Sequence, residues 1–188
     1  KKAKLVFQKE LKLDPKGNTV LVSQSSLKDM KNLLKNHLFS WQLDLLKEGG
    51  SKPLHFQTEK GSLDVILLEK SSKKESVSHH GLLKESLYTK ARDAVGHLLT
   101  KRDQKRKSIT IYFESLEKET LKGALVGIEM GAYDYVDNFT LPPLTLIYQG
   151  GQLKKEEVKQ TYKDACLLGE GVNLARELVN TPSGFKTP

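Results

Sequence analysis

Cysteine is almost absent from this chain of 188 residues, since Cys166 is the only one. A lone cysteine cannot close an internal disulfide, which excludes the disulfide-stapled small domains and indicates a reducing compartment. Long apolar runs are also missing, because stretches such as 65–68 last only a few residues, far short of the ~18 that a membrane span requires. The residues at the start, Lys1 to Lys4, contain no apolar signal-peptide core. We therefore expect a cytoplasmic protein without membrane contact.

Arginine is scarce among the cations: four of the 31 basic residues are Arg, and the net charge is +8. Positive charge attracts polyanions loosely, but specific recognition of phosphates and bases favours the planar fork of Arg. The densest cluster, 101–107, reads Lys-Arg-Asp-Gln-Lys-Arg-Lys without interleaved aromatics. It follows a predicted helix, and cations at the C-terminal end of a helix complement the negative end of its dipole. The preferred interpretation is a lysine-rich solubilising surface, and weak, non-specific DNA binding is the alternative.

The apolar pattern alternates between the period of a strand and that of a helix. It predicts strands at 3–7, 18–22, 54–58, 63–68, 109–113 and 144–148, and helices at 27–38, 87–98, 121–132 and 154–179. Ser25 or Ser26 is the expected N-cap of the first helix, and Trp41 and Leu45 extend its apolar stripe. The paired strands at 54–68 form a hairpin, and the strand at 65–68 is apolar enough to be covered on both faces. This order predicts an α/β fold with a mixed, mostly parallel sheet flanked by helices.

The histidines do not form a recognisable metal site. The chain has five of them, at His37, His55, His79, His80 and His97, and a zinc site needs three or four ligands at one point. Only two are adjacent, and neighbouring residues of an extended segment point to opposite sides. We therefore expect no metal bound by this chain.

Other candidate groups have plain structural interpretations. Cys166 lies on the apolar side of a predicted helix and is expected to be a small core residue. The pair Gly150–Gly151 precedes a helix, as an anion site would, but lacks the remaining residues of a phosphate-binding motif, so we expect a turn. Gly169 and Gly171 inside a helical pattern indicate close packing or a bend. Asp134 and Asp137 are expected in turns.

The last part of the chain carries a more specific pattern. Residues 169–183 read Gly-Glu-Gly-Val-Asn-Leu-Ala-Arg-Glu-Leu-Val-Asn-Thr-Pro-Ser, which closely resembles the junction segment of the leucyl (cytosol) aminopeptidase family. Residues 119–127 look like that family's helix before the last strand, and Thr187-Pro188 matches its next Thr-Pro. Gly184 departs from the Asn usual there, and residues 1–50 resemble the family only loosely.

This resemblance implies a fold and a function. The family's N-terminal domain is an α/β sheet related to macro domains. Its catalytic domain holds two divalent metals, Zn²⁺ or Mn²⁺, and removes N-terminal residues from peptides, and the family assembles as cytosolic homohexamers. The family motif that supplies metal ligands and the catalytic Arg, Asn-Thr-Asp-Ala-Glu-Gly-Arg, is absent here. We therefore assign no catalytic, cofactor-binding or metal-binding residue to this segment.

The expected organisation has two parts. Residues 1–152 would form the N-terminal macro-like domain, and residues 153–188 the connecting helix and the start of an absent catalytic domain. That helix would be about 39 Å long at 1.5 Å per residue. Apolar residues surround its last turns, at Val172, Leu174, Ala175, Leu178 and Val179, which predicts exposed apolar surface and hence dimerisation or packing by neighbours. The alternative function is a macro-like ligand-binding module that holds ADP-ribose at the carboxyl ends of its strands.

Overall fold

A computed structural model describes residues 3–71, 86–100, 108–133 and 143–180. Within these residues the strands form one sheet, in the order β1 (Lys4–Phe7), β6 (Leu144–Gly150), β5 (Ile109–Glu114), β2 (Asn18–Ser23), β4 (Gly61–Leu67) and β3 (Leu54–Thr58). All neighbouring strands pair in parallel except β3, which pairs with β4 as an antiparallel hairpin. The predicted mixed, mostly parallel α/β sheet is confirmed.

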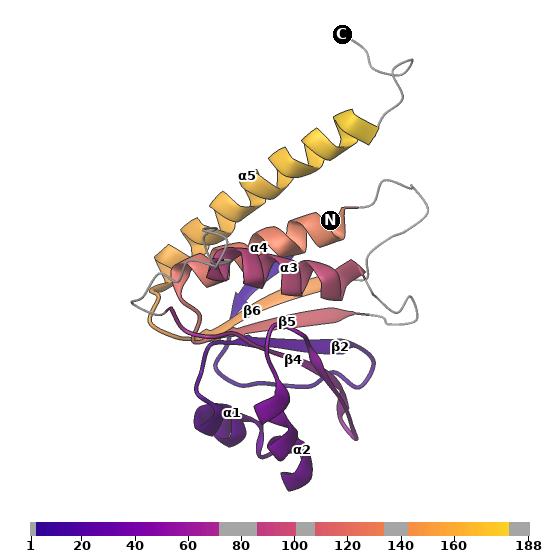
Figure 1. Cartoon of the computed structure of the whole chain (residues 1–188), viewed down its shortest axis with the longest axis vertical. Helices are drawn as coiled ribbons and strands as arrows, with labels where there is room; N and C mark the ends of the chain where they lie inside the picture. Colours follow the sequence, from indigo (N-terminus) through magenta and orange to yellow (C-terminus); the bar gives the residue numbers. More distant parts are fainter. Residues whose placement is uncertain (1–2, 72–85, 101–107, 134–142, 181–188) are drawn as a thin grey trace, which may run out of the picture.

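Helices cover both faces of this sheet (Figure 1). The helices α3 (Leu87–Thr100), α4 (Lys118–Ala132) and α5 (Lys155–Asn180) lie on one face. The helices α1 (Leu27–Leu34) and α2 (Ser40–Leu45), with the 3₁₀ turn η1 (Leu46–Glu48), lie on the other. Side chains alternate along a strand, so Ile66 of β4 packs under α3–α5 while Val65 packs under α1. The expectation that this run is covered on both faces is therefore confirmed.

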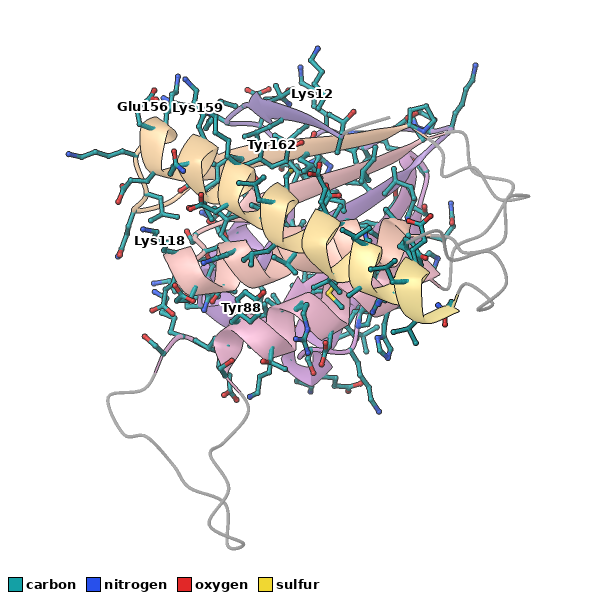
Figure 2. All side chains as sticks on the ribbon, turned by 90° about the horizontal axis from the view of Figure 1, so that it is seen from above. Lys12, Tyr88, Lys118, Glu156, Lys159 and Tyr162 are labelled. Carbon is teal, nitrogen blue, oxygen red and sulfur yellow. The ribbon has the colours of Figure 1, made fainter. Side chains whose placement is uncertain are left out.

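The first two strands are neighbours in sequence but not in the sheet. β2 lies at the centre between β5 and β4, whereas β1 pairs only with β6 at the edge, as far as the described residues show. On the helix side, the hydroxyl of Tyr162 in α5 donates to the carbonyl of Ala3 over 2.7 Å, which ties α5 to the chain just before β1. Figure 2 shows Tyr162 between α5 and the strands beneath it.

The first helix is shorter than its apolar periodicity predicts. Ser26 caps it by accepting from the Asp29 amide over 3.2 Å, and Leu34 is its last residue. A new helix, α2, begins at Ser40, which changes the direction of the chain and breaks the stripe. The expectation that Trp41 and Leu45 extend the stripe is wrong, because both lie on α2 and their side chains are 63% and 36% exposed.

Glycines bring α3 and α4 into close contact. Gly123, Gly127 and Gly131 follow one another at intervals of four along α4, so they share one face of the helix. A Cβ at Gly127 would lie 3.0 Å from the Arg92 carbonyl carbon and nearer still to its oxygen. The backbone of α3 therefore occupies the space that side chains on this face of α4 would need.

No helix in the described ranges is both long and apolar enough to cross a bilayer.

Candidate functional site

The carboxyl edge of the sheet carries a carboxylate surrounded by hydroxyl groups. Glu114 ends β5 beside Ser23 at the end of β2, because the two strands are parallel and in register. The Glu114 carboxylate accepts hydrogen bonds from the hydroxyls of Ser23 and Ser25, each over 2.5 Å, and from that of Ser115 over 2.8 Å. Ser115 has a φ of 51°, in the left-handed region that is uncommon for a residue other than glycine.

A second carboxylate lies at the same edge. Gln24 is buried and uses both ends of its amide: Nε2 donates to the Glu69 carbonyl over 2.8 Å, and Oε1 accepts from the Glu117 amide over 2.7 Å. The Glu117 carboxylate in turn accepts from the amide and the hydroxyl of Ser71, over 3.1 and 2.8 Å. In an open parallel sheet this edge is where ligands bind, but two carboxylates here repel the phosphates of a ligand such as ADP-ribose.

The glycine pair, where a turn was expected, lies at the end of β6: Gly150 is still the last residue of the strand, and Gly151 is in the bend that follows it. Gly151 has a φ of 152°, and a Cβ there would lie 2.9 Å from the Tyr148 hydroxyl. The Gly150 carbonyl accepts from the Ser115 amide over 2.8 Å. α5 begins only at Lys155, and the Glu157 carboxylate already accepts from the Lys154 amide over 2.8 Å. The first turn of this helix therefore carries its own negative charge where an anion would bind.

The amino edge of the sheet holds a buried polar chain. The Ser62 hydroxyl donates to Asn18 Oδ1 over 2.8 Å, and Asn18 Nδ2 donates to Asp64 Oδ2 over 2.8 Å. His55 Nδ1 lies 2.6 Å from Asp64 Oδ1, so with an ionised carboxylate this nitrogen carries the proton. The Asp64 side chain is 10% exposed and that of His55 is 50% exposed. The chain of contacts fastens the edge strand β3 through β4 to the central strand β2.

Sequence reasoning missed this polar chain, although a signal for it existed. Asp64 interrupts the otherwise apolar run 63–68, and a charge inside a buried strand needs a partner. His55 lies directly opposite it in the hairpin register. The predicted hairpin therefore contained the information needed to pair the two residues.

The other candidates named from the sequence separate into three groups. Among the described residues, no group of three or more His, Cys, Asp or Glu side chains is placed to hold a metal ion. Cys166 is a buried core residue, as expected, with its Sγ 3.6 Å from Glu129 Oε1. His79, His80, Asp134, Asp137, the cluster 101–107 and residues 181–188 lie outside the described residues.

The second half of α5 is held to the end of α4 by polar contacts. Asn173 Nδ2 donates to the Glu129 carbonyl over 3.0 Å, and Arg176 Nη1 donates to the Met130 carbonyl over 3.2 Å. These carbonyls belong to the last turn of α4, where a cation also complements the helix dipole. Gly169 permits the approach, because a Cβ there would lie 2.8 Å from Glu129 Cγ. The packing role expected for Gly169 is confirmed.

Gly171 does not share that role, because a Cβ there would meet nothing within 4 Å. Of the two expected explanations, close packing or a bend, close packing within the described residues therefore does not apply to Gly171.

The same half of α5 exposes large apolar side chains. Leu174 and Leu178 are 57% and 55% exposed, and Val179 is more exposed still. The buried residues of α5 end at Gly169, and beyond it the helix continues away from the sheet (Figure 1). The predicted exposed apolar surface is confirmed. We call residues 172–180 of α5 the distal segment, and they form the candidate functional surface of this chain.

The comparisons with known proteins add a fold-level likeness. No protein-family profile and no curated protein sequence matches the chain. The chain is similar to the structure of a mutant tomato leucine aminopeptidase, with a TM-score of 0.60 and 14% identity over 100% of this chain and 40% of that one. It is also similar to the bottromycin maturation enzyme BotP in complex with Mn, with a TM-score of 0.56 and 13% identity over 92% of this chain and 34% of that one.

These likenesses show the fold. The chain spans about two fifths of the length of the aminopeptidase and about one third of that of BotP. In the described residues, its sheet, its covering helices and its long last helix therefore form an architecture that also occurs as one part of these two longer chains.

Proposed function

We propose that this chain is the N-terminal, non-catalytic domain of a leucyl aminopeptidase-like metalloexopeptidase. The observation that carries the proposal is the likeness to tomato leucine aminopeptidase over 100% of this chain but only 40% of that enzyme. The motif at 169–183 supports it from the sequence. In this proposal the remaining part of the longer protein binds two divalent metals, Zn²⁺ or Mn²⁺, and trims peptides as a cytoplasmic homohexamer.

The role of the chain itself follows from the distal segment of α5. Asn173 and Arg176 bind the distal segment to α4 through hydrogen bonds, while the side chains of Leu174 and Leu178 are exposed. A helix end that is fixed in direction and apolar on its outer side is suited to hold a second domain at a defined angle. We propose that the chain orients the catalytic domain in this way and thereby shapes oligomer geometry and access to the active site.

An activity assay tests the proposal. The chain and the longer polypeptide that contains it are purified separately and incubated with leucine amide and Mn²⁺. We expect hydrolysis by the longer polypeptide only, abolished by a chelator. Hydrolysis that copurifies with the isolated chain contradicts the non-catalytic role. A source that makes no longer polypeptide, or a longer polypeptide without peptidase activity, contradicts the assignment to the peptidase.

A further inference from the structure

One glycine of α5 is an exception among the helical glycines of this fold. The described helices contain six glycines, and a Cβ at five of them would lie no more than 3.3 Å from an atom of a neighbouring helix. These five are Gly96, Gly123, Gly127, Gly131 and Gly169. Gly171 is the sixth, and it is exposed, with nothing within 4 Å of the position of a Cβ. Glycine is less favourable than alanine inside a helix, and no close packing in the described residues compensates for it here.

Exposed leucines lie on both sides of this glycine on the same face of α5. Leu167 precedes Gly171 by about one turn, and Leu174 and Leu178 follow it by about one and two turns, a spacing that aligns the four residues along one side of a helix. The three leucine side chains are between 55% and 69% exposed. We call Leu167, Gly171, Leu174 and Leu178 the leucine stripe. It begins more than a turn before the distal segment.

The leucine stripe faces away from the packed side of α5. Gly169 lies against Glu129, and Asn173 donates to a carbonyl of α4. Successive residues of an α-helix are rotated by about 100° around its axis, so Gly171 lies nearly opposite to both Gly169 and Asn173. In Figure 1 the sheet and α4 lie on one side of α5, and no other described element covers its opposite side. The stripe is therefore open to a partner along about 16 Å of the helix.

A glycine between leucines favours a helix as that partner. The missing side chain leaves a hollow between Leu167 and Leu174, and two helices pack by placing the side chains of one into the hollows of the other. Within this chain, α3 and α4 already meet in this way, because the backbone of α3 lies against Gly127. A crossing helix would fill the hollow at Gly171 and cover the leucines on either side of it.

We propose that a helix of the second domain of the longer protein crosses α5 at Gly171 and packs on the leucine stripe. This inference rests on the proposed function and adds the partner element and the point of contact. The second domain is favoured over a second copy of the chain because it would continue the polypeptide after α5. A partner tethered in this way has an effective concentration on the order of millimolar, which a free copy does not reach in dilute solution.

Oxidative footprinting read by mass spectrometry tests the proposal, because hydroxyl radicals label exposed leucine side chains. The isolated chain, at a dilution where sedimentation shows a monomer, is compared with the longer polypeptide. We expect Leu167, Leu174 and Leu178 to be labelled in the isolated chain and protected in the longer polypeptide. The residues of the second domain that gain protection should recur every three to four positions, as on one face of a helix.

Filling the hollow locates the crossing. Gly171→Leu should leave the urea midpoint of the isolated chain unchanged or higher, because a Cβ there meets open space and leucine favours a helix more than glycine does. In the longer polypeptide the same change should restore the labelling of Leu167 and Leu174. Lys28→Leu is the matched control, because it adds the same side chain at an exposed residue of α1, and it should leave the protection as it was.

The outcomes separate this inference from the proposed function. Equal labelling of the leucines in the isolated chain and in a longer polypeptide that hydrolyses leucine amide would overturn the inference and leave the function standing. Protection that survives Gly171→Leu, or that is lost when the longer polypeptide is diluted, would also overturn it, the latter by assigning the stripe to a second copy. Protected leucines in a longer polypeptide without peptidase activity would support the helix contact and contradict the function. A source that makes no longer polypeptide would overturn both.

Discussion

Single glycines decide how closely the helices of this fold approach. Gly127 faces the Arg92 carbonyl across the α3–α4 contact, whereas Gly171 on α5 has open space around the position of a Cβ. Ala is favoured over Gly inside a helix by about 1 kcal/mol. The same substitution therefore has opposite expected effects at the two positions.

The first prediction compares these two alanine substitutions. We expect Gly127→Ala to lower the free energy of unfolding by about 1–3 kcal/mol, because the helices must separate to admit the methyl group. We expect Gly171→Ala to raise it by up to about 1 kcal/mol. Urea denaturation followed by circular dichroism measures both. Equal effects of the two changes would show that α3 and α4 do not pack through this glycine face.

The hydrogen bonds of the Asp14 carboxylate make the stability of the fold depend on pH. Its carboxylate accepts from the Lys16 amide over 2.9 Å and from the Ser108 hydroxyl over 2.7 Å. These two hydrogen bonds, the Lys16 amide first, lower the pKa of Asp14 below its ordinary value of 3.8. A carboxylate whose pKa is lower in the folded than in the unfolded state stabilises the fold at pH values above its unfolded-state pKa. This contribution is lost as the pH falls through the folded-state pKa.

The second prediction follows from that sign. Asp14→Ala should destabilise the protein near neutrality, and its difference from the unmodified chain should shrink as the pH falls below 3.8. Ser108→Ala, which removes only one donor, should give a smaller difference of the same shape. Urea unfolding over a pH series measures both. A difference that is independent of pH would mean that the carboxylate's charge has no part in the turn.

At the scale of elements, α5 behaves as two halves. Its first half contributes Val158, Ala165 and Cys166 to the core. Its distal segment has no buried residue and contacts α4 through Asn173 and Arg176, whose side chains donate to backbone carbonyls. The direction of the distal segment therefore depends on polar contacts of modest strength.

The third prediction concerns this attachment. A hydrogen bond of the kind that Asn173 makes contributes about 1 kcal/mol, so Asn173→Ala should speed amide exchange in residues 173–180 by about fivefold. Leu174→Ala is the control, because that side chain is exposed and makes no polar contact. Hydrogen–deuterium exchange read by mass spectrometry measures the effect. Unchanged exchange in Asn173→Ala would show that the distal segment is held by other contacts.

At the scale of the whole molecule, the two sides of the sheet present different surfaces. The side of α3–α5 ends in the apolar distal segment, and the side of α1 and α2 exposes the aromatic side chains of Phe39 and Trp41. Exposed apolar surface of this kind drives association when nothing covers it. The isolated chain is therefore expected to associate with itself through α5.

The fourth prediction tests that association. Leu178→Lys should reduce concentration-dependent self-association, because it places a charge in the apolar surface of the distal segment. Leu27→Lys is the matched control, since Leu27 is also exposed but lies on α1. Sedimentation velocity at increasing protein concentration distinguishes the variants. Equal reduction by both, or a monomer at every concentration, would contradict association through α5.

The sequence determined the elements and the class of fold, because these depend on short-range periodicity. The strand runs, the last helix of 26 residues and the hairpin predicted at 54–68 were all readable from apolar spacing and turn residues. The core position of Cys166 and the exposed apolar end of α5 followed from the same helical period. Periodicity failed at Trp41, because the chain leaves the helix for a few residues before α2 begins, and this break turns the apolar stripe away from the core.

Only the tertiary structure decided which residues meet across the sheet. Strand order placed β1 beside β6 rather than beside β2, and no local signal encodes that choice, because each strand has apolar side chains that several partners could cover. The parallel register then brought Glu114 to Ser23. The packing of α3 against α4 required glycines on the contact face of α4, because the backbone of α3 occupies the space of a side chain there. These contacts join residues far apart in the chain, so they depend on packing and not on the local pattern.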